Sequence, residues 1–446
     1  MIDDARLALL LVRGSDRREW WRITLTALGA AVATAFALAA TAVASLRGQY
    51  HVAVADGLLD QPGERSGIVL TLLLLLVPVL GFLGQCARIG AVHRDRRLAA
   101  LRLAGASPAQ VRRIAALEAG LTCLAGSAAA TVACAVVLRV QWQSPPGVVW
   151  AGFAAVLAAV PVLGVLVSLL ALRRVVASPL GRVRRVRPDT GRGPGLPFLA
   201  AALVILLTGL VLAPASFGGF GTAPLIVFSV VILTGTGAVW ATGAAARFTG
   251  RFLAARTQNP ATLIAAERLR DDPWAAARTH AAVLLVTVVG TGFLGVRQVL
   301  LDGLHGRDRN TLAENMSFYT TGVNLTGAAV LVALVITLSG LAVGTAESLV
   351  GRRRGLAAQA AAGVPRAVLG RALLLETALP LAPAVALAGV GGLGIGVWYG
   401  QLAGGGTVPL LPVVVPVAVY AACLLAAATS LPLLRRSAHP AELRYV

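Results

Sequence analysis

Two short segments of the chain share arginines, apolar residues, a glycine and a following glutamate in the same order. The first segment ends at Gly105 and is followed by Glu118, and the second ends at Gly363 and is followed by Glu376. In both copies the glutamate stands thirteen positions after the glycine. We call residues 94–105 the first elbow and residues 352–363 the second elbow. Their flanks are long and apolar, so the charged groups here are candidates for ion pairing, proton relay or contact with a polar partner.

The two glutamates are predicted to lie near the inner ends of membrane helices. An acid within a membrane helix is costly and usually serves a purpose. One interpretation is a structural ion pair, with Arg112 or Arg113 for Glu118 and Arg371 for Glu376. The alternative is a proton or ion relay. At the depth of the membrane interface, we favour the structural ion pairs.

The chain holds no lysine, and all 39 of its Lys and Arg positions are arginine. A P-loop needs a lysine to reach the nucleotide phosphates, so a Walker A motif is absent. Residues 290–295 fit the pattern G-x-G-x-x-G, but they lie inside an apolar stretch and not after a strand. They and the glycines of 389–396 are better explained by close helix packing, although the second run could also permit flexing. We predict a non-catalytic chain.

A metal site is not expected. The four cysteines lie in apolar stretches without any C-x-x-C pair, and the five histidines are scattered. Ligand spacing typical of a metal site is therefore missing.

Composition places the chain in a membrane. Hydrophobic residues make up 57% and charged residues 13%, which is far from the balance of a soluble domain. Apolar runs near twenty residues match the thickness of the hydrocarbon core and must be helical to satisfy their backbones. We predict an all-α integral membrane protein with about ten transmembrane helices, at about 23–46, 67–92, 114–138, 148–172, 196–214, 222–245, 280–299, 322–346, 370–396 and 409–434.

Charge predicts the orientation. With the N-terminus inside, the outer loops hold as many acidic as basic residues, so the net charge of +20 lies on the inner side. This asymmetry is what the positive-inside rule expects, and it places both termini in the cytoplasm. Nucleic-acid binding is not favoured, because the arginines are dispersed over all inner loops and no soluble domain gathers them.

The elbows belong to a larger duplication. We predict a first four-helix repeat over 1–187, a linker and two-helix hairpin over 188–256, and a second four-helix repeat over 257–446. An even number of intervening helices makes the repeats parallel, unlike inverted transporter repeats. Each repeat begins with a helix, at 5–13 and 261–270, that we expect along the inner interface with its apolar face toward lipid.

Each elbow is predicted to be a short helix that stops at its glycine. Gly105 suits a left-handed C-terminal residue, Ser107 is a good N-cap for the next helix, and Pro108 is a good first helical residue. The second elbow has Val364 and Pro365 at these places, so it loses the cap but keeps the proline. The sequence therefore predicts that the two elbows are alike but unequal as docking points.

The pattern R-x-L-A-x-L-R-x-x-G-A-S of the first elbow, with the later glutamate and the ending at 440–444, resembles the permease domain of FtsX-like proteins of MacB/LolC-type ABC transporters. In that family the helix between the second and third spans contacts the cytoplasmic ATPase. The resemblance implies ATPase-coupling residues in the first elbow at Arg96, Arg97, Leu98, Leu101, Arg102, Leu103 and Gly105. In the second elbow it implies coupling residues at Arg352, Arg353, Arg354, Leu356, Gln359 and Gly363.

The resemblance further implies a bacterial plasma-membrane permease that works with two copies of a cytoplasmic ABC ATPase. ATP and Mg²⁺ would bind to that partner, and no cofactor to this chain. The expected substrate is amphiphilic: a lipid, a peptide antibiotic or a hydrophobic drug. The order of four, two and four helices is similar to permeases of peptide-antibiotic resistance modules, but the loop at 297–321 is too short for their external domain.

Two other functions stay open. The chain could transmit a signal to a small extracellular or membrane partner without moving a substrate. It could also be an ion-driven transporter, which is the least favoured because no carboxylates are expected near the membrane centre. Beyond these partners we expect contact with membrane lipid and none with nucleic acid.

Overall fold

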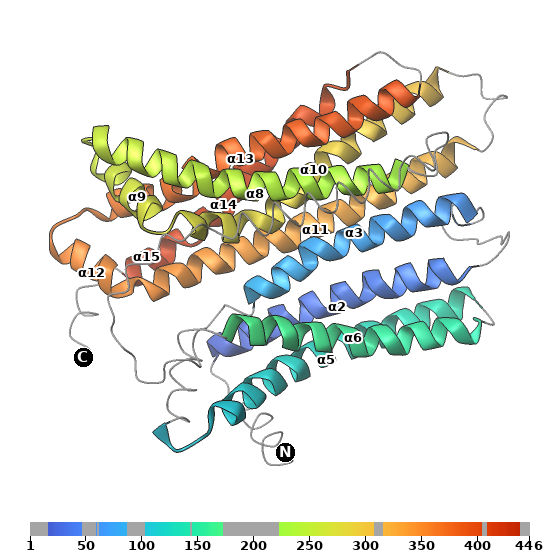
Figure 1. Cartoon of the computed structure of the whole chain (residues 1–446), viewed down its shortest axis with the longest axis horizontal. Helices are drawn as coiled ribbons and strands as arrows, with labels where there is room; N and C mark the ends of the chain where they lie inside the picture. Colours follow the sequence, from blue (N-terminus) through green and yellow to red (C-terminus); the bar gives the residue numbers. More distant parts are fainter. Residues whose placement is uncertain are drawn as a thin grey trace. The chain divides into compact units, whose positions relative to one another are not determined.

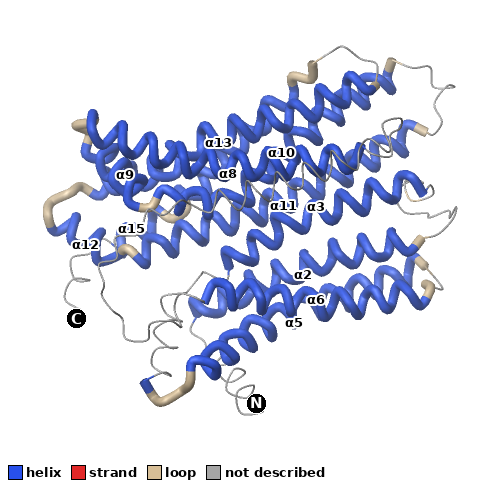
Figure 2. Tube along the Cα trace, in the orientation of Figure 1, coloured by secondary structure: helices blue, strands red, loops and turns tan. Residues whose placement is uncertain are grey.

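The computed structural model describes residues 17–46, 59, 62–86, 103–142, 145–172, 223–306, 315–403 and 408–437. All regular structure in these ranges is helical, and no strand occurs among them. Figure 2 shows long helices, with short loops between some of them. The predicted all-α fold class is confirmed.

The chain divides into two compact units, Met1–Val186 and Arg187–Val446. The first unit contains α2 (Arg17–Ser45), α3 (Pro62–Cys86), α5 (Pro108–Gln141) and α6 (Gly147–Leu172). Helix α2 packs against the other three (Figure 1). A side chain on Gly126 of α5 would overlap the carbonyl oxygen of Ala27, so the α2 and α5 backbones nearly touch there.

The second unit is built around three long helices, α8 (Ala223–Arg256), α10 (Pro273–His305) and α13 (Arg366–Leu402), which pack against one another. Helix α11 (Met316–Gly351) packs on α10, and α14 (Val414–Ala428) packs on α13 and α11. The shorter elements are α9 (Pro260–Asp271), α12 (Arg353–Ala361), the 3₁₀ turn η4 (Leu411–Val413) and α15 (Leu431–Ser437).

Glycines bring α10 and α13 into close contact. A Cβ atom on Gly295 would lie 2.9 Å from the Cα atom of Gly396, and one on Gly392 would lie 2.5 Å from Cβ of Thr291. Neither glycine run lies in a nucleotide-binding loop, and both occupy the crossing of two membrane helices. The predicted role of these glycines in helix packing is confirmed.

Eight helices in the described part of the chain are long and apolar enough to cross a membrane. They correspond to eight of the ten predicted spans. The predicted span at 67–92 overlaps α3, which is helical but is not among the eight. The predicted span at 196–214 lies outside the described residues.

Helix α9 confirms the helix predicted at 261–270, but the prediction that its apolar face points toward lipid is wrong. Ala265, Ala266 and Leu269 are buried against the neighbouring helices α8 and α13. The close approach of the α9 and α8 backbones explains this burial: a Cβ on Gly250 of α8 would lie only 2.9 Å from the Ala266 carbonyl oxygen. The matching segment at 5–13 lies outside the described residues.

Candidate functional site: the second elbow and its ion pairs

The second elbow is a separate short helix between two long ones. Helix α11 ends at Gly351, Arg352 turns the chain, and α12 runs from Arg353 to Ala361 before α13 begins at Arg366. The predicted helix–stop–helix arrangement is present. Its long neighbours α11 and α13 are two of the eight candidate membrane helices.

A left-handed glycine ends α12. Gly363 has φ +89°, its N–H donates to the Ala360 carbonyl at 3.0 Å, and the Val364 N–H donates to the Gln359 carbonyl at 3.1 Å. These two bonds form a Schellman motif, which satisfies carbonyls that the helix end leaves open. Only glycine takes this φ without steric cost.

The first elbow ends in the same way. Gly105 has φ +95°, and Gly105 and Gly363 are the glycines with positive φ within the described ranges. The next helix, α5, begins with Pro108 and a capping box: the Ser107 hydroxyl accepts from the Gln110 N–H at 3.2 Å, and the Gln110 side chain accepts from the Ser107 N–H at 2.7 Å. Both the left-handed stop and the cap are confirmed predictions.

The second elbow lacks this cap, as predicted. Pro365 itself occupies the N-cap position of α13 and makes no side-chain capping bond. The two elbows therefore share the stop and differ in how the next helix starts.

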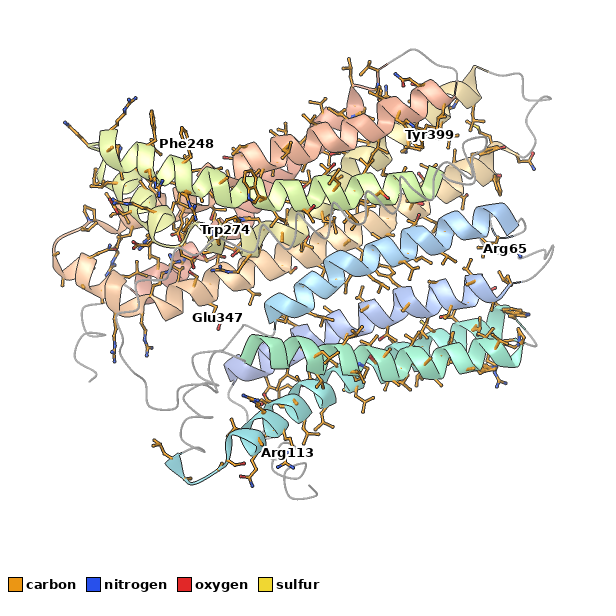
Figure 3. All side chains as sticks on the ribbon, in the orientation of Figure 1. Arg65, Arg113, Phe248, Trp274, Glu347 and Tyr399 are labelled. Atoms are coloured by element: carbon orange, nitrogen blue, oxygen red, sulfur yellow. The ribbon has the colours of Figure 1, made fainter. Side chains whose placement is uncertain are left out.

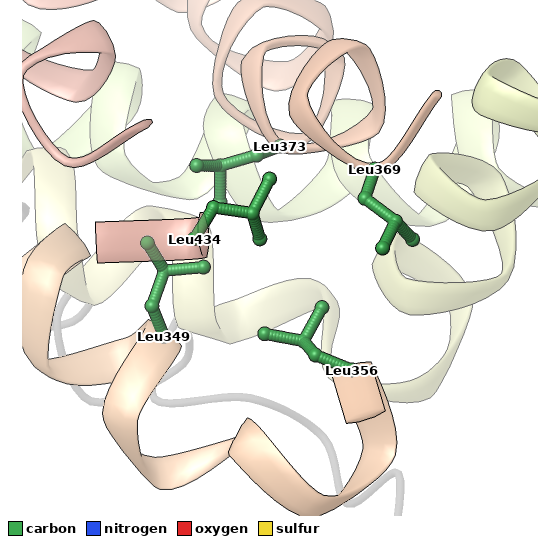
Figure 4. Close-up of a cluster of buried hydrophobic side chains, with 5 residues drawn as sticks. All are labelled: Leu349, Leu356, Leu369, Leu373 and Leu434. Atoms are coloured by element: carbon green, nitrogen blue, oxygen red, sulfur yellow. The ribbon is translucent and has the colours of Figure 1, made fainter. Parts of the chain in front are cut away.

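One face of α12 is buried in a leucine cluster. Leu356 is 1% exposed and packs with Leu349 of α11, Leu369 and Leu373 of α13, and Leu434 of α15 (Figure 4). Burying one leucine stabilises the contact by about 1.5–3 kcal/mol. The position of Leu356 means that this predicted coupling residue can anchor the elbow but cannot itself face a partner.

The opposite face of α12 is exposed. It consists of small residues, Gly355, Ala358 and Ala361, with the exposed Arg354 beside them. Gln359 lies between the two faces, and its Oε1 is buried without a hydrogen-bond partner among the described residues. Such a surface allows another protein's backbone to come close.

Glu376 joins three segments through two ion pairs. Its Oε1 accepts from Arg352 of the elbow at 2.7 Å, and its Oε2 accepts from Arg268 of α9 at 3.2 Å. The Glu376 side chain is only 19% exposed, so water weakens these pairs less than at an open surface. A structural ion pair at this glutamate is thus observed.

The partner predicted for Glu376 was wrong. Arg371 is exposed and makes no ion pair with Glu376 within the described part of the chain. Arg268 is more than a hundred positions earlier, and no spacing in the sequence links it to Glu376. Only the packing of α9 against α13 brings the two charges together.

The first elbow is described only in part. Arg96, Arg97, Leu98, Leu101 and Arg102 lie outside the described residues. Leu103 is 77% exposed, and Glu118 is buried at 4% exposure with its carbonyl oxygen accepting from the Thr122 hydroxyl at 2.9 Å. The predicted partners Arg112 and Arg113 both lie at exposed positions.

Metal-ligating groups do not gather in the part of the chain that the structure describes: it holds no group of three or more His, Cys, Asp or Glu side chains that could hold an ion. The four cysteines are free thiols. The second elbow is a short helix with a small exposed surface. Leucine contacts hold its buried face, and the ion pair of Arg352 with Glu376 holds one end.

Comparison with known proteins adds one finding. No curated protein matches the chain significantly. Residues 68–180 match the family model of the FtsX-like permease C-terminal domain. This match covers about a quarter of the chain and does not extend to the second elbow, so the second repeat stays a prediction. The segment from α3 through the first elbow to the end of α6 is similar to an FtsX-like permease domain.

Proposed function

We propose that this chain is the membrane subunit of an ATP-driven ABC transporter and that separate cytoplasmic subunits hydrolyse the ATP. The observation that carries the proposal is the match to an FtsX-like permease domain across the first elbow, in a helical chain with eight candidate membrane spans. Permeases of this family pair with ABC ATPases. The lysine-free sequence holds no Walker A motif, which agrees with an ATPase supplied in trans.

The second elbow supports a specific route for the mechanical coupling. One ATPase subunit would bind the exposed face around Ala358 and Ala361. Behind that face, Leu356 joins the elbow to α11, α13 and α15, and the pair between Arg352 and Glu376 joins it to α9 through Arg268. A movement of the ATPase would therefore act on several helices together, provided that its contacts differ between the ATP-bound and free states.

The first elbow would take the second ATPase subunit. Its exposed Leu103 and its left-handed Gly105 occupy the same places in the pattern as Ala361 and Gly363. The transported substrate would be amphiphilic, because the chain is dominated by apolar helices. Even its longest external loops are too short to form a folded domain that captures a substrate.

Co-purification with a candidate ABC ATPase from the same organism tests the docking surface. Ala358→Glu and Ala361→Glu place a large acidic group on the exposed face of α12, and we expect each to lower the amount of bound ATPase by more than about tenfold. Ala403→Glu, at an exposed alanine just beyond the far end of α13, is the matched control and should leave binding unchanged. Undiminished binding in both elbow variants would remove the second elbow from the proposed role.

The rate of ATP hydrolysis distinguishes the transport function from the signalling function. In membranes that contain both subunits, a transported lipid or amphiphilic peptide should stimulate hydrolysis. Leu356→Ala should weaken this stimulation while the ATPase stays bound, because the buried anchor and not the docking face is changed. Stimulation by an external protein partner alone would favour the signalling function.

A further inference from the structure

A cavity of about 670 Å³ lies where α8, α9 and the start of α10 meet. Its charged lining consists of Arg247 and Arg251 from α8 with Glu267 and Arg270 from α9. The volume is within the range of sites that bind small ligands. With three arginines and one glutamate, the lining has a net positive charge, which suits an anion.

The two α8 arginines stand one helical turn apart on the same face. Like charges at this spacing repel each other, so an isolated helix would be destabilised by them. Neither Arg247 nor Arg251 forms an ion pair within the described ranges, and the Nη2 atom of Arg247 is buried without a hydrogen-bond partner there. Buried donors in folded proteins are nearly always satisfied, which indicates that something binds to this group.

A second buried donor lies beside the first. The indole ring of Trp274 packs directly on Gly243 of α8, where a Cβ atom would lie 2.5 Å from the ring. The Trp274 Nε1 is buried and also has no hydrogen-bond partner among the described residues. Trp274, Arg247 and Arg251 together line a smaller hollow of about 290 Å³ that adjoins the first.

An exposed aromatic surface borders these hollows. Phe248 is 68% exposed and stacks on Phe252, with 6.0 Å between the ring centroids. Trp240, which is 47% exposed, lines the smaller hollow together with Phe248. Figure 3 labels Phe248 and Trp274 at the end of the second unit that carries α9 and α12. Buried donors and exposed aromatic rings thus occur side by side at one end of a candidate membrane helix.

We infer that this cavity binds the phosphate-bearing headgroup of an anionic membrane phospholipid, with the acyl chains lying along the Phe248 and Phe252 rings. The guanidinium groups match the geometry of a phosphate, and the buried indole N–H adds a neutral donor. Basic pockets between helices at the cytoplasmic side are suited to anionic headgroups. Aromatic side chains are also typical of the membrane–water interface.

Glu267 weakens the attraction of the cavity for an anion. Its Oε1 lies 3.5 Å from Nη1 of Arg270, so the carboxylate occupies one of the three arginines and adds a negative charge to the cavity wall. Removal of this charge should strengthen the binding of an anion. This inference does not depend on the ATPase, because the cavity lies in α8–α10 and shares no residue with the exposed face of α12.

The test uses the full chain in nanodiscs of phosphatidylcholine with a minority of spin-labelled phosphatidylglycerol, and it measures the immobilised fraction of the label. Each arginine near the surface contributes about a fivefold factor to binding. We therefore expect Arg247→Gln and Arg251→Gln each to weaken binding about fivefold. Arg366→Gln removes an exposed arginine that lines neither hollow and is the matched control.

Three further variants keep the inference testable if an arginine variant does not fold. Trp274→Phe keeps an aromatic ring but removes the indole N–H, so binding should fall, whereas Trp20→Phe, at an exposed tryptophan of α2 that lines neither hollow, should not change it. Glu267→Gln should increase binding. Cooperative thermal unfolding of each variant in pure phosphatidylcholine shows that the variant is folded.

Competition in solution distinguishes a lipid from a free phosphate. Glycerol phosphate and inorganic phosphate should fail to displace the labelled lipid, because they lack the acyl chains that contact the phenylalanines. Displacement by either at the concentrations at which the lipid itself binds would overturn the lipid assignment. Equal immobilisation in the arginine variants and the control would overturn the site itself.

Discussion

Glu376 is the most connected charged residue among the described ion pairs of the second unit. Each of its two oxygens accepts from a different segment, Arg352 at the elbow and Arg268 on α9. Removal of one arginine would leave one carboxylate oxygen without its charged partner at a largely buried site, which is unfavourable. Glu376, on α13, therefore connects its helix to the elbow and to α9. Its observed contacts are those of a structural ion pair.

Glu376→Gln should destabilise the protein by about 1–3 kcal/mol, because the amide oxygen can accept from only one arginine and the amide NH2 cannot accept from the other. Denaturant titration in mixed micelles measures the free energy of unfolding. The matched variant is Glu267→Gln, whose pair with Arg270 is about half exposed at both ends. It should cost less than about 1 kcal/mol, and equal losses in the two variants would contradict this assignment.

The two glycines of the second elbow should respond to alanine in opposite directions. Gly363→Ala forces a side chain into a left-handed conformation and should cost about 1–2 kcal/mol. Gly355→Ala, inside α12 with open space around its Cβ position, should stabilise the helix by up to about 1 kcal/mol. The free energy of unfolding of the permease alone, without ATPase, measures both, and a loss at Gly355 as large as that at Gly363 would rule out the conformational cause.

At the scale of elements, the short helix α12 is held by its environment and not by its own length. A helix of nine residues is marginal by itself. Its stability comes from Leu356 in the leucine cluster, from the Schellman motif at Gly363 and from the ion pair at Arg352. These three contacts leave one face of α12 free for a partner.

The packing of α10 against α13 can be tested with one pair of glycines. Gly392→Ala introduces a Cβ atom 2.5 Å from Cβ of Thr291 and should destabilise the protein by about 1–3 kcal/mol. Gly394→Ala, two positions later on the same helix, meets no atom within 4 Å and should be neutral or stabilising. Thermal unfolding in detergent compares the two variants, and equal midpoints would argue against close packing at this crossing.

At the scale of the whole molecule, the arginine distribution predicts which ends of the helices face the cytoplasm. Helix α13 has 37 residues and is about 55 Å long, more than the hydrocarbon core of about 30 Å. A helix of this length that crosses the membrane has its two ends on opposite sides. The elbow end carries the arginines, and we expect it inside.

Cysteine labelling on this one helix tests the orientation. A membrane-impermeant maleimide should label Gln401→Cys in intact cells and Ala367→Cys only after permeabilisation, because both positions are exposed at opposite ends of α13. The background should be low, since Cys86, Cys123 and Cys423 are buried and Cys134 is half-buried. Labelling in the reverse order would invert the predicted topology.

The sequence by itself determined the class of the protein and the local design of the elbows. Apolar runs of membrane length predicted the helices, and the glycine, serine and proline around 105–108 predicted a left-handed stop followed by a capped helix. The glycines of α10 and α13 were also correctly assigned to packing. These features depend on neighbours a few positions away and on general solvent preference, so they can be derived without a fold.

Only the tertiary structure decided which side chains meet across the bundle. It placed Leu356 inside the leucine cluster, paired Glu376 with Arg268 in place of Arg371, and turned the apolar face of α9 toward α8 and α13. It also brought Arg247 and Trp274 together around one hollow. The physical reason is that a charge can pair with any opposite charge that packs against it, and a small apolar face can be buried by any helix that packs against it. In this chain those partners come from segments that are in some cases more than a hundred residues apart, and no local spacing encodes that approach.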